Sequence, residues 1–164
     1  MPTEILPLDA HDTRILGELQ RDARITMAEL GRRVNLSQPA VTERVRKLEL
    51  QGVIRGYRAV VDPQRLGYGI RALVRIGRVE YARMLKLIEQ TPEVTNAWNV
   101  TGEDSWVLEI AVIDVEHLDA VLTRYCILAQ TSTAIVLNAP RENGPVLPAR
   151  RENIRPAIRK PTGR

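Results

Sequence analysis

The sequence lacks the residues on which several classes of protein depend. Its 164 residues include a single cysteine, Cys126, which excludes an internal disulfide and any metal site built from cysteines. The apolar runs are short and interrupted by charged residues, so no segment is long enough to span a membrane. Residues 1–10 lack the basic and apolar blocks of a secretory signal, and we therefore expect a cytoplasmic protein.

Patterns typical of catalysis are also missing. The chain shows no Ser/His/Asp or Cys/His arrangement, no metal-binding motif and no phosphate-binding loop. His11 and His117 are far apart and fall in predicted surface helices, where we interpret them as ordinary polar residues rather than ligands. We expect Cys126 to be a small buried residue, and Trp98 and Trp106 to pack on a sheet. The sequence therefore predicts a protein that is not an enzyme and that holds no cofactor or metal.

The net charge of +4 is unevenly distributed along the chain. Residues 1–62 hold ten Arg and Lys against nine Asp and Glu, and residues 63–138 hold seven against nine. Residues 139–164 hold seven against two, a net charge of +5. We interpret the middle segment as a part that does not bind nucleic acid. The last segment is typical of a solvated basic arm, which can bind phosphates but is at least as often a solubilising tail.

Residues 9–52 carry the pattern of three short helices. Apolar residues recur at helical spacing, and each helix is preceded by a residue whose side-chain oxygen can cap it: Asp9, Thr26 and Ser37. Glu29 lies three residues after Thr26, which is the spacing of a capping box. The first helix is expected over about 9–21, the second to end near Asn35, and the third to end at Gly52. Three such helices with tight turns are typical of a helix-turn-helix.

The rest of the chain alternates between strand and helix patterns. Residues 53–61 alternate weakly between apolar and polar, which makes them a candidate wing or linker strand. Beyond them the order is strand, helix, strand, strand, helix, strand, over about 70–76, 81–90, 93–100, 105–113, 115–125 and 130–137. This order predicts an α+β fold in which a ferredoxin-like βαββαβ sandwich carries both helices on one face of an antiparallel sheet.

Four parts follow from these patterns. We expect a winged helix-turn-helix domain over 1–52, a linker or wing strand over 53–66, a ferredoxin-like domain over 67–138, and a basic Pro/Arg-rich tail over 139–164. Within the tail, residues 143–150 are expected to form at most an extra edge strand.

One face of the predicted sheet has no helix to cover it. Alternate residues from Trp106 to Val112 point to one face of the third strand, whereas Val107, Ala111 and Ile113 point to the other. A monomer would expose this second apolar set. A symmetric homodimer that stacks two sheets would bury it, and twofold pairing is the commonest arrangement.

The third helix carries the residues that we expect to bind double-stranded DNA. With Val41, Val45 and Leu48 turned inward, its outer face is polar, and a helix of this kind fits the major groove, where arginine binds guanine and glutamine binds adenine. The predicted DNA-binding residues are Ser37, Gln38, Thr42, Glu43, Arg44, Arg46, Lys47, Arg32, Arg33 and Arg55. The residues among them that suit phosphate contacts are Lys47, Arg32, Arg33 and Arg55. The alternative for these charges is a solvated helix face.

Several stretches between residues 8 and 138 together match a known pattern. They read LDAHDTRIL at 8–16, DAR at 22–24, EL at 29–30, LS at 36–37, RVRKLE at 44–49, GVIRGY at 52–57 and VTGEDS at 100–105, closing near 131–137. These stretches resemble the Lrp/AsnC family of feast/famine regulators. The resemblance implies a winged helix-turn-helix DNA-binding domain over 1–52, followed by a ferredoxin-like effector-binding and oligomerisation domain over 67–138. It also implies dimers that assemble further, often to octamers, on the DNA of the nucleoid.

The resemblance further implies a small-molecule effector, usually an amino acid, that shifts assembly or DNA affinity. The effector would lie between sensor domains, near the turn formed by Thr101, Gly102, Glu103, Asp104 and Ser105. A glycine there lets backbone N–H groups meet a carboxylate, and Asp104 could meet an ammonium group. The family often has an acidic residue where this chain has Ser105. On the residues alone, a plain hairpin turn remains the alternative.

Two other functions remain open from the sequence. An architectural protein that wraps DNA without an effector keeps every argument for DNA binding. Sirohaem decarboxylases resemble the same two-domain family, but they would need basic and histidine groups around a tetrapyrrole cavity, and the predicted sensor strands contain no histidine.

Overall fold

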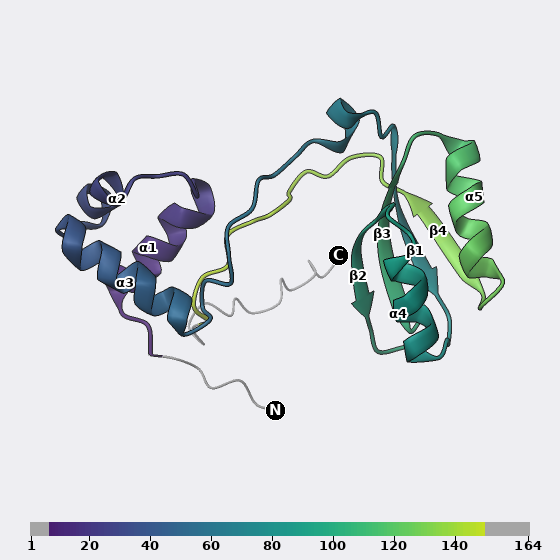
Figure 1. The fold of residues 1–164 in the computed structure, drawn as a ribbon, viewed down its shortest axis with the longest axis horizontal. Helices are drawn as coiled ribbons and strands as arrows, with labels where there is room; N and C mark the ends of the chain where they lie inside the picture. The colour runs from purple at the N-terminus through teal and green to yellow at the C-terminus, as the bar shows by residue number, and fades with distance from the viewer. Residues whose placement is uncertain (1–6, 150–164) are drawn as a thin grey trace, which may run out of the picture. The chain divides into compact units, whose positions relative to one another are not determined.

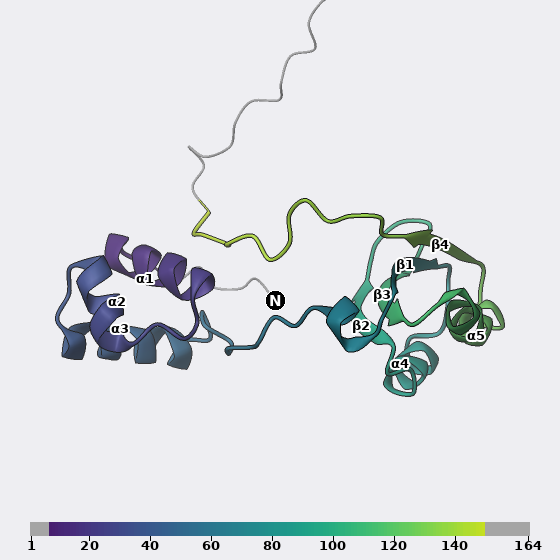
Figure 2. The same cartoon turned by 90° about the horizontal axis from the view of Figure 1, so that it is seen from above.

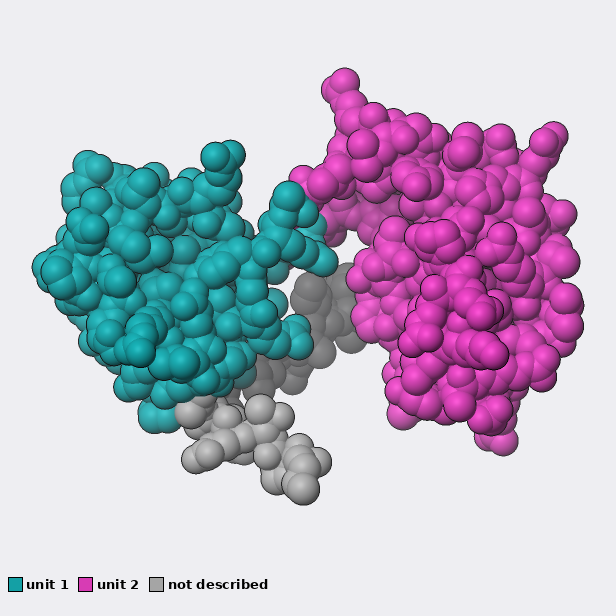
Figure 3. Space-filling view, viewed as in Figure 1, with its two compact units in different colours: residues 1–59, 143–164 teal, residues 60–142 magenta. Residues whose placement is uncertain are grey.

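A computed structural model describes residues 7–149, which form two compact units. The first unit takes the described residues up to Ala59 together with those from Asn143 onward, and the second takes Val60–Glu142 (Figure 3). Each unit has a hydrophobic core of its own. No helix in this described part of the chain combines the length and the apolar character needed to cross a membrane.

Three helices form the first unit: α1 (Ala10–Arg21), α2 (Met27–Val34) and α3 (Gln38–Leu50) (Figure 1). The predicted caps are confirmed, because the side chains of Asp9, Thr26 and Ser37 each accept a backbone N–H of the following helix. The reciprocal capping box expected at Thr26 is absent. The carboxylate of Glu29 accepts a hydrogen bond from Arg33 instead of reaching back to the cap.

The core of the first unit contains nine buried apolar side chains, eight from the three helices and one, Ile25, from the turn between α1 and α2. They are Ile15, Leu16, Leu19, Ile25, Leu30, Val34, Val41, Val45 and Leu48. Burying one aliphatic side chain of this size contributes roughly 1.5–3 kcal/mol, so this set holds α3 with one fixed face toward the core.

The strand predicted over 53–61 is absent. After Gly52, whose φ of 68° ends α3, the N–H groups of Val53 and Ile54 both donate to the carbonyl of Leu48, and their side chains pack against the core. No strand of the described residues lies beside 55–61 to pair with it, and a weak alternation without a pairing partner does not make a sheet. The chain continues to a short 3-10 helix, η1 (Pro63–Leu66).

The second unit confirms the predicted order of elements. It comprises β1 (Ile70–Ile76), α4 (Tyr81–Glu89), β2 (Val94–Asn99), β3 (Trp106–Val112), α5 (Val115–Cys126) and β4 (Thr131–Ile135). All strand pairs are antiparallel, in the order β2-β3-β1-β4. Both helices lie on the same face of the sheet (Figure 2), where Met84 of α4 and Val121 of α5 pack with the core residues of β1 and β3.

Within residues 7–149, no α-helix of the second unit lies on the opposite face of the sheet. Trp98 pairs with Val107 in the register of β2 and β3, and both therefore point to this open face. Leu73 and Trp98 are 38% and 46% exposed. Glu109 is buried on the same face, where Arg71 donates to one carboxylate oxygen and Asn96 donates to the other.

Two further expectations need correction. Residues 143–149 form no edge strand, because Val146 bonds to a side chain of α1 rather than to a neighbouring strand. Residues 150–164, the rest of the predicted basic tail, lie outside the described residues. Cys126 is exposed rather than buried, since α5 turns Leu118, Val121 and Tyr125 to the core and the next residue points outward.

Candidate nucleic-acid interface

The turn between α2 and α3 is built on a glycine in the last part of α2. A Cβ at Gly31 would lie 2.7 Å from the carbonyl oxygen of Leu36, so only glycine permits this close approach. The N–H of Leu36 donates to the carbonyl of Gly31 at 2.8 Å, and Asn35 takes the left-handed conformation with φ of 58°. The sequence analysis did not single out Gly31. A glycine inside a predicted helix was the available signal. Such a glycine lowers helix stability, so its presence indicates that close packing requires it.

The face of α3 opposite the core is exposed along its length. Val41, Val45 and Leu48 are at most 5% exposed. The exposed side chains are Ser37 at the cap, then Gln38, Thr42, Glu43, Arg46 and Lys47. A polar face of this length, held against a well-packed core, presents hydrogen-bonding groups in a fixed arrangement to a partner in solution.

Arg44 on the flank of α3 has carboxylate partners. Its Nη1 donates to Asp9 Oδ2 at 2.7 Å and to Asp12 Oδ1 at 2.8 Å, so that α3 is fastened to the start of α1. The backbone N–H of Asp12 and the Arg44 guanidinium together hold the pKa of Asp9 below its ordinary value of 3.8. These contacts occupy donors of Arg44 that a phosphate would otherwise use.

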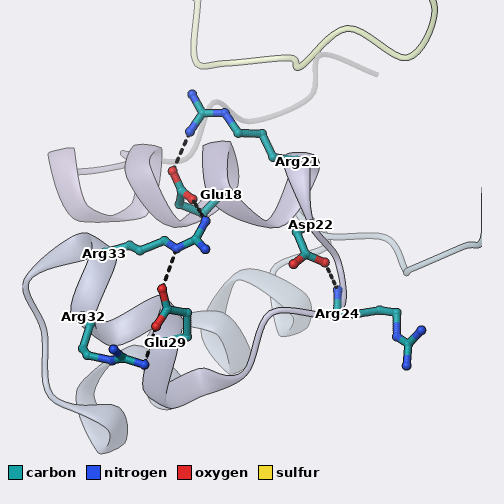
Figure 4. Close-up of polar contacts among 7 residues, drawn as sticks. All are labelled: Glu18, Arg21, Asp22, Arg24, Glu29, Arg32 and Arg33. Atoms are coloured by element: carbon teal, nitrogen blue, oxygen red, sulfur yellow. Dashed lines mark hydrogen bonds and ion pairs between the residues drawn. The ribbon is translucent and has the colours of Figure 1, made fainter.

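A chain of ion pairs joins α1 to α2 (Figure 4). Arg33 donates from Nε to Glu29 at 2.9 Å and from Nη1 to Glu18 at 3.0 Å. Arg21 pairs with Glu18 at 2.5 Å, and Arg32 pairs with Glu29. The hydrogen bond from Arg33 also holds the pKa of Glu29 below its usual range. The sequence analysis did not anticipate Glu18 as a partner, because it lies 15 residues from Arg33.

The six predicted DNA-binding cations differ in their carboxylate partners, and Arg32 pairs with one of them, Glu29. Arg33 and Arg44 each bond to two carboxylates. Arg46 is 3.7 Å from Glu43, a long and solvent-exposed contact. Lys47 and Arg55 are exposed and have no carboxylate partner among residues 7–149.

The turn predicted to bind an effector joins β2 to β3. The N–H of Val100 donates to the carbonyl of Ser105 at 2.9 Å, and the N–H of Ser105 donates to Ile76 at 2.9 Å. Gly102 has φ of 126°, which a larger residue would adopt only with strain. Thr101, Gly102 and Glu103 are exposed, whereas Asp104 and Ser105 are half-buried. Asp104 lies 3.9 Å from Nε of Arg75.

A shallow apolar pocket of the second unit lies away from this turn. It is lined by Val61, Pro63, Leu66, Tyr68, Pro92, Glu93, Thr95 and Ala111, a set that includes no residue of 101–105. Because Thr101, Gly102 and Glu103 are exposed, the turn of one chain offers backbone and polar side chains to solvent.

The histidines and tryptophans take up structural contacts. His11 Nδ1 is 3.2 Å from the carbonyl of Val34, and His117 Nε2 is 3.0 Å from Glu93 Oε1. No group of three metal-ligating side chains occurs within the described range. Trp106 is buried, and the centroid of its ring lies 5.4 Å from the ring centroid of Tyr81. Trp98 lies on the open face of the sheet.

Comparison with known proteins identifies both units. Residues 8–55 match the winged helix-turn-helix DNA-binding model, and residues 71–146 match the Lrp/AsnC ligand binding domain. The chain is 33% identical to the HTH-type transcriptional regulator LrpC of Bacillus subtilis, over 81% of this chain and 94% of that protein. It is 45% identical to the leucine-responsive regulatory protein of Rhizobium meliloti, over 62% of this chain and 69% of that protein.

Solved structures of transcription regulators share the fold. The structure of Bacillus subtilis LrpC matches with a TM-score of 0.78 at 32% identity, covering 83% of this chain and 99% of that one. A transcriptional regulator of Neisseria meningitidis, solved as a complex with L-Met, matches with a TM-score of 0.79 at 26% identity, covering 85% of this chain and 96% of that one.

Proposed function

This chain belongs to the Lrp/AsnC family of DNA-binding transcription regulators, and we propose that it recognises specific double-stranded DNA and changes its DNA affinity or assembly when an amino acid binds. The observation that carries the proposal is the exposed polar face of α3, which lies opposite a buried apolar face. DNA binding is assigned to residues 1–52, and effector binding and oligomerisation to 67–138. Such a protein acts in the cytoplasm, on the nucleoid.

Within α3 we assign base recognition to the outermost side chains. Arg46 can donate hydrogen bonds to guanine, and Gln38 can bind adenine through its amide. Glu43 can accept a hydrogen bond from the amino group of cytosine. Ser37 and Thr42 are placed to contact the backbone or a base edge. Each well-made contact to a base discriminates against the wrong base by about 1–3 kcal/mol.

Cations around α3 are assigned to the phosphates. Lys47 and Arg55 have no carboxylate partner in the described chain and suit phosphate contacts best, and Arg32 is exposed at the end of α2. Arg33 and Arg44 act as positioning residues, because their guanidinium groups fasten α2 and α3 to carboxylates of the same unit. This division sorts the predicted arginines into one base contact, Arg46, two phosphate contacts, Arg32 and Arg55, and two positioning residues, Arg33 and Arg44.

The open face of the sheet supports a homodimer. Leu73 and Trp98 are exposed on it beside Val107, and a second sheet stacked on this face would bury them. A twofold dimer also presents two copies of α3 to two half-sites of DNA. Further assembly to an octamer is proposed on the family resemblance.

The effector is proposed to bind at the turn 101–105. The Neisseria meningitidis regulator was solved with L-Met, which supports an amino acid as the class of ligand. The turn lies on an open surface, so we expect a second copy of the chain to complete the site. The free backbone around Gly102 would meet the carboxylate of the ligand, and Asp104 its ammonium group.

The test is binding of the purified protein to the DNA upstream of its own gene, against random DNA of equal length, at two salt concentrations. We expect a preference for the upstream DNA that persists at the higher salt. Arg46→Ala should reduce that preference, whereas Lys47→Ala should weaken binding to both DNAs and lower the salt slope by about 1. Arg65→Ala is the matched control, because that side chain is 89% exposed in the second unit.

Three results would contradict the proposal. Equal, salt-sensitive binding to both DNAs would indicate an architectural protein rather than one that recognises sequence. Equal losses on both DNAs for Arg46→Ala and Lys47→Ala would remove the assigned division between base and phosphate contacts. No binding to either DNA would exclude a DNA-binding role altogether.

A further inference from the structure

Helix α1 contains a glycine at an interior position. Gly17 lies in the middle of Ala10–Arg21 and is half-buried. Glycine at such a position costs about 1 kcal/mol of helix stability relative to alanine. A feature that weakens a helix locally is expected where packing or function requires it.

At Gly17 the missing side chain leaves room for Leu147. A Cβ at position 17 would lie 4.0 Å from Leu147 Cδ2, an ordinary van der Waals contact. A longer side chain would have to occupy the space that Leu147 fills. The glycine therefore leaves a space on the surface of α1 in which the side chain of Leu147, 130 positions further along the chain, can pack.

Gln20, one turn after Gly17, bonds to the residue next to Leu147. Its Oε1 accepts the N–H of Val146 at 2.7 Å, and its Nε2 donates to the carbonyl of Val146 at 2.9 Å. One side chain thus satisfies both backbone groups of Val146, as a neighbouring strand would. Residues three apart lie on the same face of a helix, so both contacts come from a single surface of α1.

The segment that reaches this surface comes directly from the second unit. Glu142, its last residue in that unit, forms an ion pair with Arg71 of β1. Asn143, the next residue, accepts a hydrogen bond from Arg58 at 3.3 Å within the first unit. The chain therefore passes between the two units twice, once at residues 59–60 and once at residues 142–143.

We propose that the Gly17 and Gln20 surface of α1 is a docking site for residues 143–148, which we name the C-terminal clip. The clip gives the DNA-binding unit a second connection to the effector-binding unit, which is covalent at residues 142–143 and noncovalent where the clip docks on α1. Two connections restrict the motion of the DNA-binding unit more than one does, and in a dimer this restriction favours binding to two half-sites at once. This consequence for DNA rests on the proposed function, whereas the docking itself does not.

The docking is tested by hydrogen exchange in the full-length protein, read at the amide of Val146. In the wild-type protein this amide should be protected. In the Gly17→Leu variant the Val146 amide should exchange freely, because the new leucine occupies the space in which Leu147 packs. Leucine is also a good helix former, so α1 itself should remain intact. Gly17→Ala is the matched control and should keep the protection, since its Cβ makes only an ordinary contact.

A second variant releases the clip without touching α1. Leu147→Asp, at a half-exposed position, should remove the protection of Val146 and leave the amides of α1, α2 and α3 unchanged. The docking proposal is overturned if Val146 exchanges freely in the wild-type protein. It is also overturned if the Val146 amide is equally protected from exchange in the Gly17→Leu and Gly17→Ala variants.

The effect on DNA is measured with the same variants. Gly17→Leu and Leu147→Asp should lower the affinity for DNA with two half-sites on the order of tenfold, while binding to one half-site stays unchanged. Loss of protection with unchanged two-site affinity would overturn the role of the clip in DNA binding. Failure of the proposed function would be distinct, because the wild-type protein itself would then show no DNA preference while the exchange results stand.

Discussion

Replacing Gly31 by alanine should destabilise the first unit, although alanine favours a helix. In a free helix the change stabilises by about 1 kcal/mol. Here the new Cβ would lie 2.7 Å from the carbonyl oxygen of Leu36, a backbone atom that cannot swing away. Relief requires α2 and α3 to separate by several tenths of an ångström, which would also lengthen the hydrogen bond from Leu36 to Gly31. Overpacking of this kind costs about 1–3 kcal/mol, and a weakened hydrogen bond costs about 1 kcal/mol more.

The net loss is therefore about 1–3 kcal/mol, which lowers the Tm of a unit of this size by roughly 4–24 °C. Thermal unfolding measures the shift, and hydrogen exchange in α2 and α3 assigns it to the first unit. Gly17→Ala is the internal comparison: it makes the same chemical change in α1, where the added Cβ meets only Leu147 at 4.0 Å. We expect that variant to be as stable as the wild-type protein or more so.

The geometry requires that Gly31→Ala lowers the Tm and that Gly17→Ala leaves it unchanged or raises it. If Gly31→Ala raised the Tm as Gly17→Ala does, the close approach of α2 to the turn would not exist in solution. The position of α3 relative to α2 would then have to be revised, and with it the assignment of the exposed face to DNA.

Three further outcomes are expected. Arg44→Ala should destabilise the first unit and weaken binding to all DNA in proportion, without changing base preference, as measured by unfolding and by binding to upstream and random DNA. Asp9, whose folded-state pKa is lowered, contributes stability that is present above its unfolded-state pKa and is lost as the pH falls through the folded value. Asp9→Asn should therefore flatten the loss of stability in acid, and an unchanged acid profile would argue against the Arg44 pair. Gly102→Val should abolish the response to amino acids while DNA binding survives, and an unchanged response would exclude the turn as the effector site.

Local patterns in the sequence were sufficient for most of the fold. Caps at Asp9, Thr26 and Ser37 depend on residues within one helical turn, and the periodicity of residues 70–137 depends on alternation within each element. The buried face of α3 follows from the spacing of Val41, Val45 and Leu48. These features are local, so a sequence displays them directly.

Features that depend on distant partners were not predictable in the same way. The alternation over 53–61 is real, but a strand also needs a neighbour, and the described chain provides none. The carboxylates that hold Arg44 precede it by 32 and 35 residues, and Gln20 is 126 residues from Val146. No spacing rule relates such positions, so Arg44 resembled its neighbour Arg46 in the sequence although their surroundings differ.

Those surroundings explain how a unit with little net charge can be suited to DNA. Residues 1–62 hold almost as many carboxylates as cations, which at first argues against a phosphate-binding surface. Among the described residues, however, the carboxylates Asp9, Asp12 and Glu18 are engaged by Arg44 and Arg33, away from the outer face of α3. Their negative charge is neutralised where it fastens the helices together. The potential on the outer face of α3 is therefore set mainly by Arg46, Lys47 and Glu43, whose summed charge is positive, and the carboxylates paired elsewhere in the unit add little to it.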